Sequence, residues 1–149
     1  MNTTNAESDN RVENLFRWIM VLPAGLVSII LVSFPVHWVA LGTFKYGSLV
    51  EGLSDDAVDN VERVIFMFFA PLVFVVAGAK VAPKHRMGVA IALSSLLILL
   101  SGASLAYVLL SPSLFFETPV RGSIGFGSGI LGLATALYTV KSKASEQRL

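Results

Sequence analysis

The chain has 149 residues, of which 54% are hydrophobic and 14% are charged, and its net charge at pH 7 is +1. Soluble globular domains carry about 25% charged residues, so this composition excludes a soluble domain, a nucleic-acid-binding protein and a disordered chain. The sequence contains no cysteine, which also excludes disulfides and thiolate metal sites.

The charged residues are segregated along the chain, and this segregation identifies its long apolar segments. Asp, Glu, Lys and Arg are missing from residues 18–44, 64–79, 87–116 and 122–140. These stretches hold 92 residues, so all 21 charged side chains lie in the other 57. Because a hydrocarbon core about 30 Å thick is crossed by roughly 20 apolar residues in a helix, each stretch predicts one transmembrane helix. The predicted fold class is all-α, an integral membrane four-helix bundle with short loops.

In chain order, a polar tail of residues 1–14 precedes a four-transmembrane-helix domain of residues 15–141, and a tail of residues 142–149 follows. The four helices are expected at about residues 15–40, 61–81, 87–110 and 122–141. Pro23 and Pro35 fall in the first helix and Pro71 in the second. Because proline has no backbone N–H to donate, we expect a bend or an end at these positions.

The basic residues predict the orientation of the bundle. Eight of them lie near the helix ends on one side: Arg11, Arg17, Lys80, Lys84, Arg86, Lys141, Lys143 and Arg148. The other side has three, namely Lys45, Arg63 and Arg121. Since cytoplasmic loops are enriched in Lys and Arg, both termini are predicted to be cytoplasmic (N-in/C-in). We expect the membrane to be the plasma membrane of a prokaryote.

Small residues recur at helical spacing in the last two predicted helices and are the candidate interaction residues. The fourth helix has a face made of Gly122, Gly125, Gly129, Gly132 and Ala136. The third helix has a face made of Gly88, Ala92, Ser95, Leu99, Gly102 and Ala106. Steps of three and four place such a series on one side of a helix, and small residues allow close backbone approach in lipid. Either the two faces pack together within one subunit, or the glycine face binds a second copy or another membrane protein.

Acidic residues accumulate before the second predicted helix, at Glu51, Asp55, Asp56, Asp59 and Glu62. Carboxylates are ligands for divalent cations, but this spacing is not that of an EF-hand loop. Negative charge at the start of a helix suits the helix dipole. We therefore favour a solvated acidic face over a cation site.

His37 is the one imidazole inside the four apolar stretches. We predict an interfacial histidine that hydrogen-bonds to water and lipid, and the alternatives are a protonation gate or contact with a quinone-like headgroup. His85 is expected on the opposite side of the membrane, which excludes a bis-histidine haem.

The sequence lacks the residue patterns that are typical of catalytic sites. It has no nucleophile–base pair, HExxH motif, phosphate-binding loop or carboxylate dyad, so we predict no enzymatic activity, cofactor or metal. Transport paths are marked by intramembrane ionisable residues. Here only an uncharged path lined by hydroxyls is available, from Ser28, Ser33, Ser94, Ser95, Ser101, Ser104, Ser128, Thr135 and Thr139.

The predicted function is therefore that of a non-catalytic, small multi-pass membrane protein that acts through helix–helix contacts. It would be an accessory, assembly or scaffold subunit of a membrane complex, or a homo-oligomer. The alternative is a small channel or transporter with the hydroxyl-lined path. The expected partners are the lipid bilayer and another membrane protein or a second copy of the chain, and not nucleic acid.

Overall fold

The computed structural model describes residues 3–45, 55–110 and 119–146, and these residues are helical except for a short turn at 82–85. The elements are α1 (Thr3–Ala40), a π-helical turn η1 (Leu41–Lys45), α2 (Asp55–Val81), α3 (Arg86–Leu110) and α4 (Pro119–Glu146). Four helices in this part of the chain are long and apolar enough to cross a membrane. The shortest, α3, has 25 residues, which is about 38 Å at 1.5 Å per residue. The predicted all-α class is confirmed.

The helices extend beyond the apolar stretches of the sequence. α1 begins at Thr3 and thus includes most of the polar segment that precedes its apolar residues, while α2 begins at Asp55 and α4 at Pro119. Acidic residues at the start of α2 suit the helix dipole, and proline is well placed at a first helical position. Pro23 and Pro35 lie inside α1, and Pro71 lies inside α2, so none of them ends its helix.

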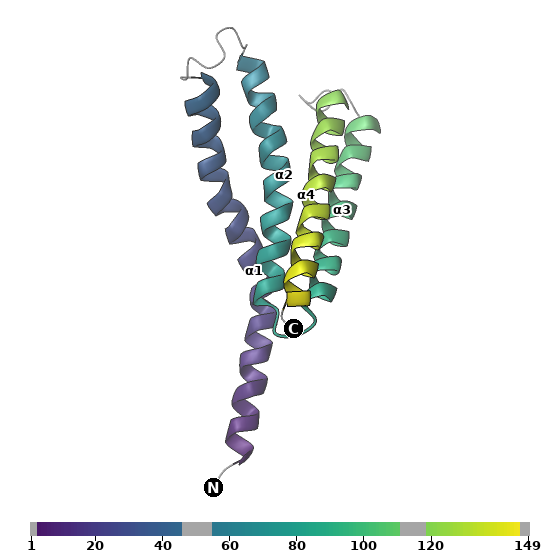
Figure 1. Ribbon diagram of the computed structural model, residues 1–149. Helices are drawn as coiled ribbons and strands as arrows, with labels where there is room; N and C mark the ends of the chain where they lie inside the picture. The colour runs from purple at the N-terminus through teal and green to yellow at the C-terminus, as the bar shows by residue number, and fades with distance from the viewer. Residues whose placement is uncertain (1–2, 46–54, 111–118, 147–149) are drawn as a thin grey trace.

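α2 is the central helix of the bundle. It packs against α1, α3 and α4, and α4 packs in addition against α3. Figure 1 shows α1 beside α2 and α3 beside α4, with the chain's two ends at the same end of the bundle and the start of α1 projecting beyond the other helices. The two helix pairs draw together toward the α2–α3 turn and diverge toward the opposite end (Figure 1).

The buried core lies at the end where the α2–α3 turn is found, which we call the closed end. Its residues come from all four helices and from the α2–α3 turn: Val21, Phe74, Val75, Ala79, Ala82, Val89, Ala90, Leu93, Leu133, Ala136 and Val140. Four of them are alanines, and Ala90 and Ala136 have no exposed surface. Small side chains shorten the distance between helix axes, so they bring the helices together at this end.

The turn of residues 82–85 keeps α2 and α3 close at the closed end. Ala82 N–H donates to the Gly78 carbonyl at 3.2 Å, and Val89 N–H donates to the His85 carbonyl at 3.0 Å. His85 has φ 54°. This left-handed conformation is unfavourable for a residue with a Cβ, and here it allows the chain to reverse within four residues.

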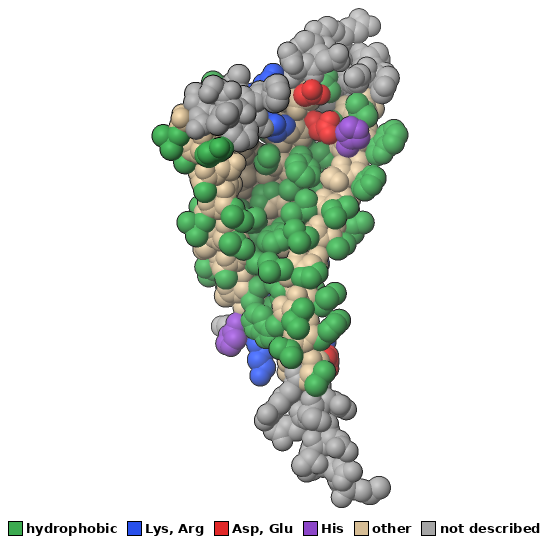
Figure 2. All heavy atoms as spheres, turned by 180° about the vertical axis from the view of Figure 1, so that it is seen from behind, with side chains coloured by type: hydrophobic (Ala, Val, Ile, Leu, Met, Phe, Trp, Pro, Cys, Tyr) green, Lys and Arg blue, Asp and Glu red, His purple; other side chains and the backbone are tan. Residues whose placement is uncertain are grey.

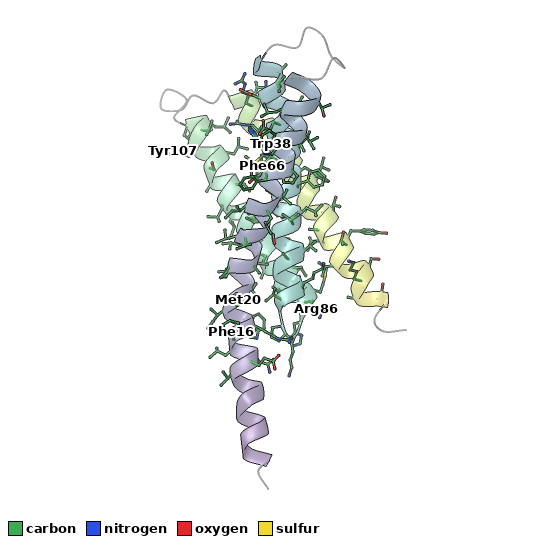
Figure 3. All side chains as sticks on the ribbon, turned by 90° about the vertical axis from the view of Figure 1, so that its left-hand side faces the viewer. Phe16, Met20, Trp38, Phe66, Arg86 and Tyr107 are labelled. Atoms are coloured by element: carbon green, nitrogen blue, oxygen red, sulfur yellow. The ribbon has the colours of Figure 1, made fainter. Side chains whose placement is uncertain are left out.

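The opposite end, where α2 and α4 begin, is called the open end. Figure 3 shows Trp38 and Tyr107 toward this end, and Phe16, Met20 and Arg86 toward the closed end. Trp38 is 69% exposed and Tyr107 is 51% exposed. Aromatic residues near both ends of long apolar helices are typical of proteins whose helix ends lie at membrane–water interfaces.

Candidate functional site

The glycine face of α4 packs against α2. A Cβ on Gly132 would collide with the carbonyl oxygen of Phe68, and one on Gly129 would lie 3.6 Å from the carbonyl oxygen of Met67. A Cβ on Gly125 would lie 3.7 Å from Cγ of Met67. The spacing of these glycines therefore serves close contact within the chain, with α2 rather than with the expected partner, α3.

The other predicted interaction residues are dispersed. Gly122 faces α3, where a Cβ would lie 3.4 Å from Leu105 Cδ1. Gly102 has open space around it, Gly88 is near only His85 of the adjoining turn, and Ala92 is exposed. The structure thus brings the α4 glycines together against α2 and α3, and it does not bring Gly88, Ala92 or Gly102 into that contact.

Two close helix contacts involve glycines that the sequence reasoning did not consider. A Cβ on Gly25 of α1 would lie 2.6 Å from the Phe74 ring of α2, and one on Gly78 of α2 would lie 2.5 Å from Leu93 Cδ1 of α3. An isolated glycine in an apolar helix is a weak signal for such contacts, because it has no series to define a face. Among the described glycines, Gly25, Gly78 and Gly132 are those at which an added Cβ would lie within 3.0 Å of a neighbouring helix.

A polar contact joins α1 and α2 at the open end. Nδ1 of His37 lies 2.7 Å from Oε1 of Glu62, and the two side chains are 54% and 26% exposed. His37 therefore has a protein partner in addition to the water and lipid predicted for it. The side chains of Glu51, Asp55 and Asp56 lie outside the described residues, and those that are described include no cluster of three potential metal ligands.

The hydroxyls inside the apolar helices mostly hydrogen-bond to backbone carbonyls. Four donate to a carbonyl four residues earlier in the same helix, as Ser28 does to Ala24 at 2.7 Å; the others are Ser101, Thr135 and Thr139. Ser128 of α4 instead donates to the Val64 carbonyl of α2 at 2.7 Å, which joins two helices. Ser94 is 2% exposed, and its Oγ has no hydrogen-bond partner among the described residues. Most of the described hydroxyls therefore bond to backbone carbonyls of the helices.

A cavity of about 400 Å³ opens between α2, α3 and α4, with Ile29 of α1 at its edge. Its floor includes Gly122, Gly125 and Gly129, which have no side chains to fill it. Arg63 of α2 and Arg121 of α4 also line it, both from near the start of their helices and thus at the open end. Figure 2 shows this face hollowed, with apolar side chains inside and both basic and acidic groups near the upper end. The cavity thus combines an apolar interior with two guanidinium groups.

No family model, curated protein or solved structure matches the chain. The function is therefore inferred from the residues and contacts described above. They provide close helix packing, a hydrogen bond between α1 and α2, and a cavity that is apolar at one end and basic at the other.

Proposed function

We propose that the protein is a multi-pass membrane protein of a prokaryotic plasma membrane, with both termini in the cytoplasm. The support is the presence of four helices of sufficient length and apolarity among the described residues and the excess of Lys and Arg at the closed end and in the terminal segments. Single cysteines test the orientation cleanly, because the chain has none. In intact cells an impermeant maleimide should label Thr43→Cys at the open end, and Lys84→Cys only after permeabilisation; the reverse pattern contradicts the orientation.

Within that membrane we propose a non-catalytic role as an accessory, assembly or scaffold subunit that acts through helix–helix contacts. The observation that carries this proposal is an apolar stripe on α1. Leu26, Ile30, Phe34 and Trp38 are between 56% and 69% exposed and follow one another at steps of four residues, which places them on one face. The α4 glycines contact α2 and α3 within the chain, and the most apolar segment of α1 is only 11% buried, against 17% for α3, so α1 offers an unpacked face for another transmembrane helix.

Cross-linking from α1 tests this role. Leu26→Cys and Ile30→Cys in native membranes should give defined cross-linked products, either with a second copy or with one other protein that also co-purifies stoichiometrically in mild detergent. Leu99→Cys on α3, where Leu99 is 71% exposed, is the matched control and should give none. Equal cross-linking from both helices, or none from α1, contradicts the proposal.

The alternative function, a small channel or transporter with an uncharged path, is favoured by one feature. Ser101 and Ser104 line the cavity, so hydroxyls are present on one wall. Purified protein in sealed vesicles, tested with a panel of ions and small solutes, distinguishes the two functions. Reproducible flux that Ser104→Phe abolishes would replace the accessory role with this one.

A further inference from the structure

The cavity between α2, α3 and α4 has the two-part chemistry of an amphiphile site. Its interior is apolar and includes Met67, Leu100, Leu105 and Val108, while Arg63 and Arg121 lie at the open end. A volume of about 400 Å³ is within the range of about 300–1,000 Å³ typical of small-ligand sites. Such a cavity is large enough for part of a lipid, such as one acyl chain, and too small for a second protein helix.

The charged residues among the cavity's described lining residues are both basic, since Arg63 and Arg121 line it and no Asp or Glu does. Glu62 contacts His37 of α1, so this carboxylate is turned away from the cavity that its neighbour Arg63 lines. Arg121 lies in the first turn of α4, where backbone N–H groups have no partner within the helix and the helix dipole adds positive potential. Each arginine makes another interaction as well, and a guanidinium has five N–H donors, so one partner does not exhaust it.

We propose that this cavity binds an anionic phospholipid, with one acyl chain in the apolar interior and the phosphate between Arg63 and Arg121. Arginine suits phosphate because its planar fork donates two parallel hydrogen bonds. With the open end at the membrane surface, the two arginines lie where the headgroup of a lipid would be. The apolar interior then lies deeper, where its acyl chain would be. This inference rests on the membrane location proposed above and is independent of the accessory role.

Two kinds of variant separate the headgroup contact from the chain contact. Arg63→Gln/Arg121→Gln removes the positive charge, and its matched control is Lys84→Gln, an exposed basic residue of the α2–α3 turn at the closed end. Ser104→Phe fills the cavity from α3, and its matched control is Ala103→Phe, which is exposed on the same helix and does not line the cavity. Ile130→Trp fills the cavity from α4 and replaces Ser104→Phe if that variant does not fold.

The measurement is lipid retention by the purified full-length protein. Delipidated protein in detergent receives equal amounts of phosphatidylglycerol and phosphatidylcholine with identical acyl chains, and native mass spectrometry counts the lipids retained per chain. Circular dichroism confirms the helical content of every variant. The proposed membrane location is tested separately: if it is wrong, the protein will not fractionate with membranes. The accessory role is tested by cross-linking from α1, which does not depend on lipid retention.

We expect the wild-type chain to retain one phosphatidylglycerol in preference to phosphatidylcholine. Each arginine should contribute about fivefold to that preference, the effect expected of one basic group near an anionic lipid surface. The variant that lacks both arginines should therefore lose both contributions. The cavity-filling variants should lose retention of both lipids, and both controls should behave as the wild type. Soluble glycerol 3-phosphate should not displace the lipid at equal concentration, because it lacks the chain.

Three results would overturn the inference. One is equal retention of the two lipids by the wild type. Another is unchanged retention by folded Ser104→Phe or Ile130→Trp, which would place the chain outside the cavity. The third is displacement by glycerol 3-phosphate, which would identify a free phosphate compound, and not a lipid, as the ligand.

Discussion

The closed end and the open end of this bundle are built from the same four helices but with different residues at their contacts. At the closed end Ala79, Ala82, Ala90 and Ala136 are almost completely buried, and a turn of four residues joins α2 to α3. At the open end α3 diverges from α2, and the space between them is a cavity with two arginines. The difference indicates that small residues act in two ways: buried alanines allow the four helices to pack closely at the closed end, whereas Gly122, Gly125 and Gly129 leave space that α3 does not fill toward the open end.

The largest effect is expected at the α4 glycine whose added Cβ would lie nearest to the α2 backbone. Replacing Gly132 with Leu forces a side chain against the carbonyl oxygen of Phe68, which is backbone and cannot rotate away. We expect a loss of stability of about 3 kcal/mol or more, at the upper end of over-packing effects. Gly127→Leu on the same helix has open space and should change stability little. Thermal unfolding in detergent, followed by circular dichroism, measures both; similar losses would show that the contact with Phe68 is not responsible, since leucine is the better helix former at both positions.

Creating a cavity at the closed end should lower the free energy of unfolding by less than the over-packing at Gly132. Val75 has no exposed surface, so Val75→Ala removes packed atoms from the core and should destabilise the bundle by about 2 kcal/mol. Val120 at the start of α4 is 67% exposed, and Val120→Ala serves as the control with an effect near zero. Equal midpoints in denaturation for the two variants would show that burial at the closed end does not stabilise the fold.

One substitution should make the closed end more stable. Ser94 is buried there without a hydrogen-bond partner for its Oγ among the described residues, so its hydroxyl is desolvated without compensation. Ser94→Ala should raise stability by about 1 kcal/mol, whereas Ser95→Ala, at an exposed position, should not. A decrease in the unfolding temperature of Ser94→Ala would reveal a hydrogen bond that stabilises the native state.

The smallest effect concerns the contact that joins α1 to α2 at the open end. His37→Gln and Glu62→Gln each disrupt the 2.7 Å contact, and since both groups are partly exposed we expect losses of at most about 1 kcal/mol. A double-mutant cycle gives the coupling between the two residues. A coupling well above this limit would show that the open end is held together by polar contacts as firmly as the closed end is by packing.

The helices could be predicted from the sequence, but most of their contacts could not. The absence of charged residues from a stretch can be seen in that stretch alone, and it was enough to locate the four apolar helices. The spacing of Gly125, Gly129 and Gly132 predicted that they share one face of α4. Periodicity does not predict which helix packs against that face, and in the structure it is α2. His37 and Glu62 are 25 positions apart, and their meeting depends on how far α1 is shifted along α2. The cavity forms because α3 diverges from α2, and this divergence depends on contacts among several helices and cannot be predicted from the sequence of one segment.

The contact between α4 and α2 has a further consequence for how this sequence can vary. Gly129 and Gly132 approach carbonyl oxygens of Met67 and Phe68, which every amino acid possesses. The requirement for a particular residue at these oxygens therefore falls on α4, while positions 67 and 68 of α2 present the same carbonyl whatever their side chains are. Sequence change should be one-sided there, with the glycines retained and positions 67 and 68 open to replacement, whereas Pro71, whose Cγ would lie 3.2 Å from a Cβ on Gly132, is a side-chain contact. Pairwise covariation, the usual trace of contact, should then be weak where these helices are closest.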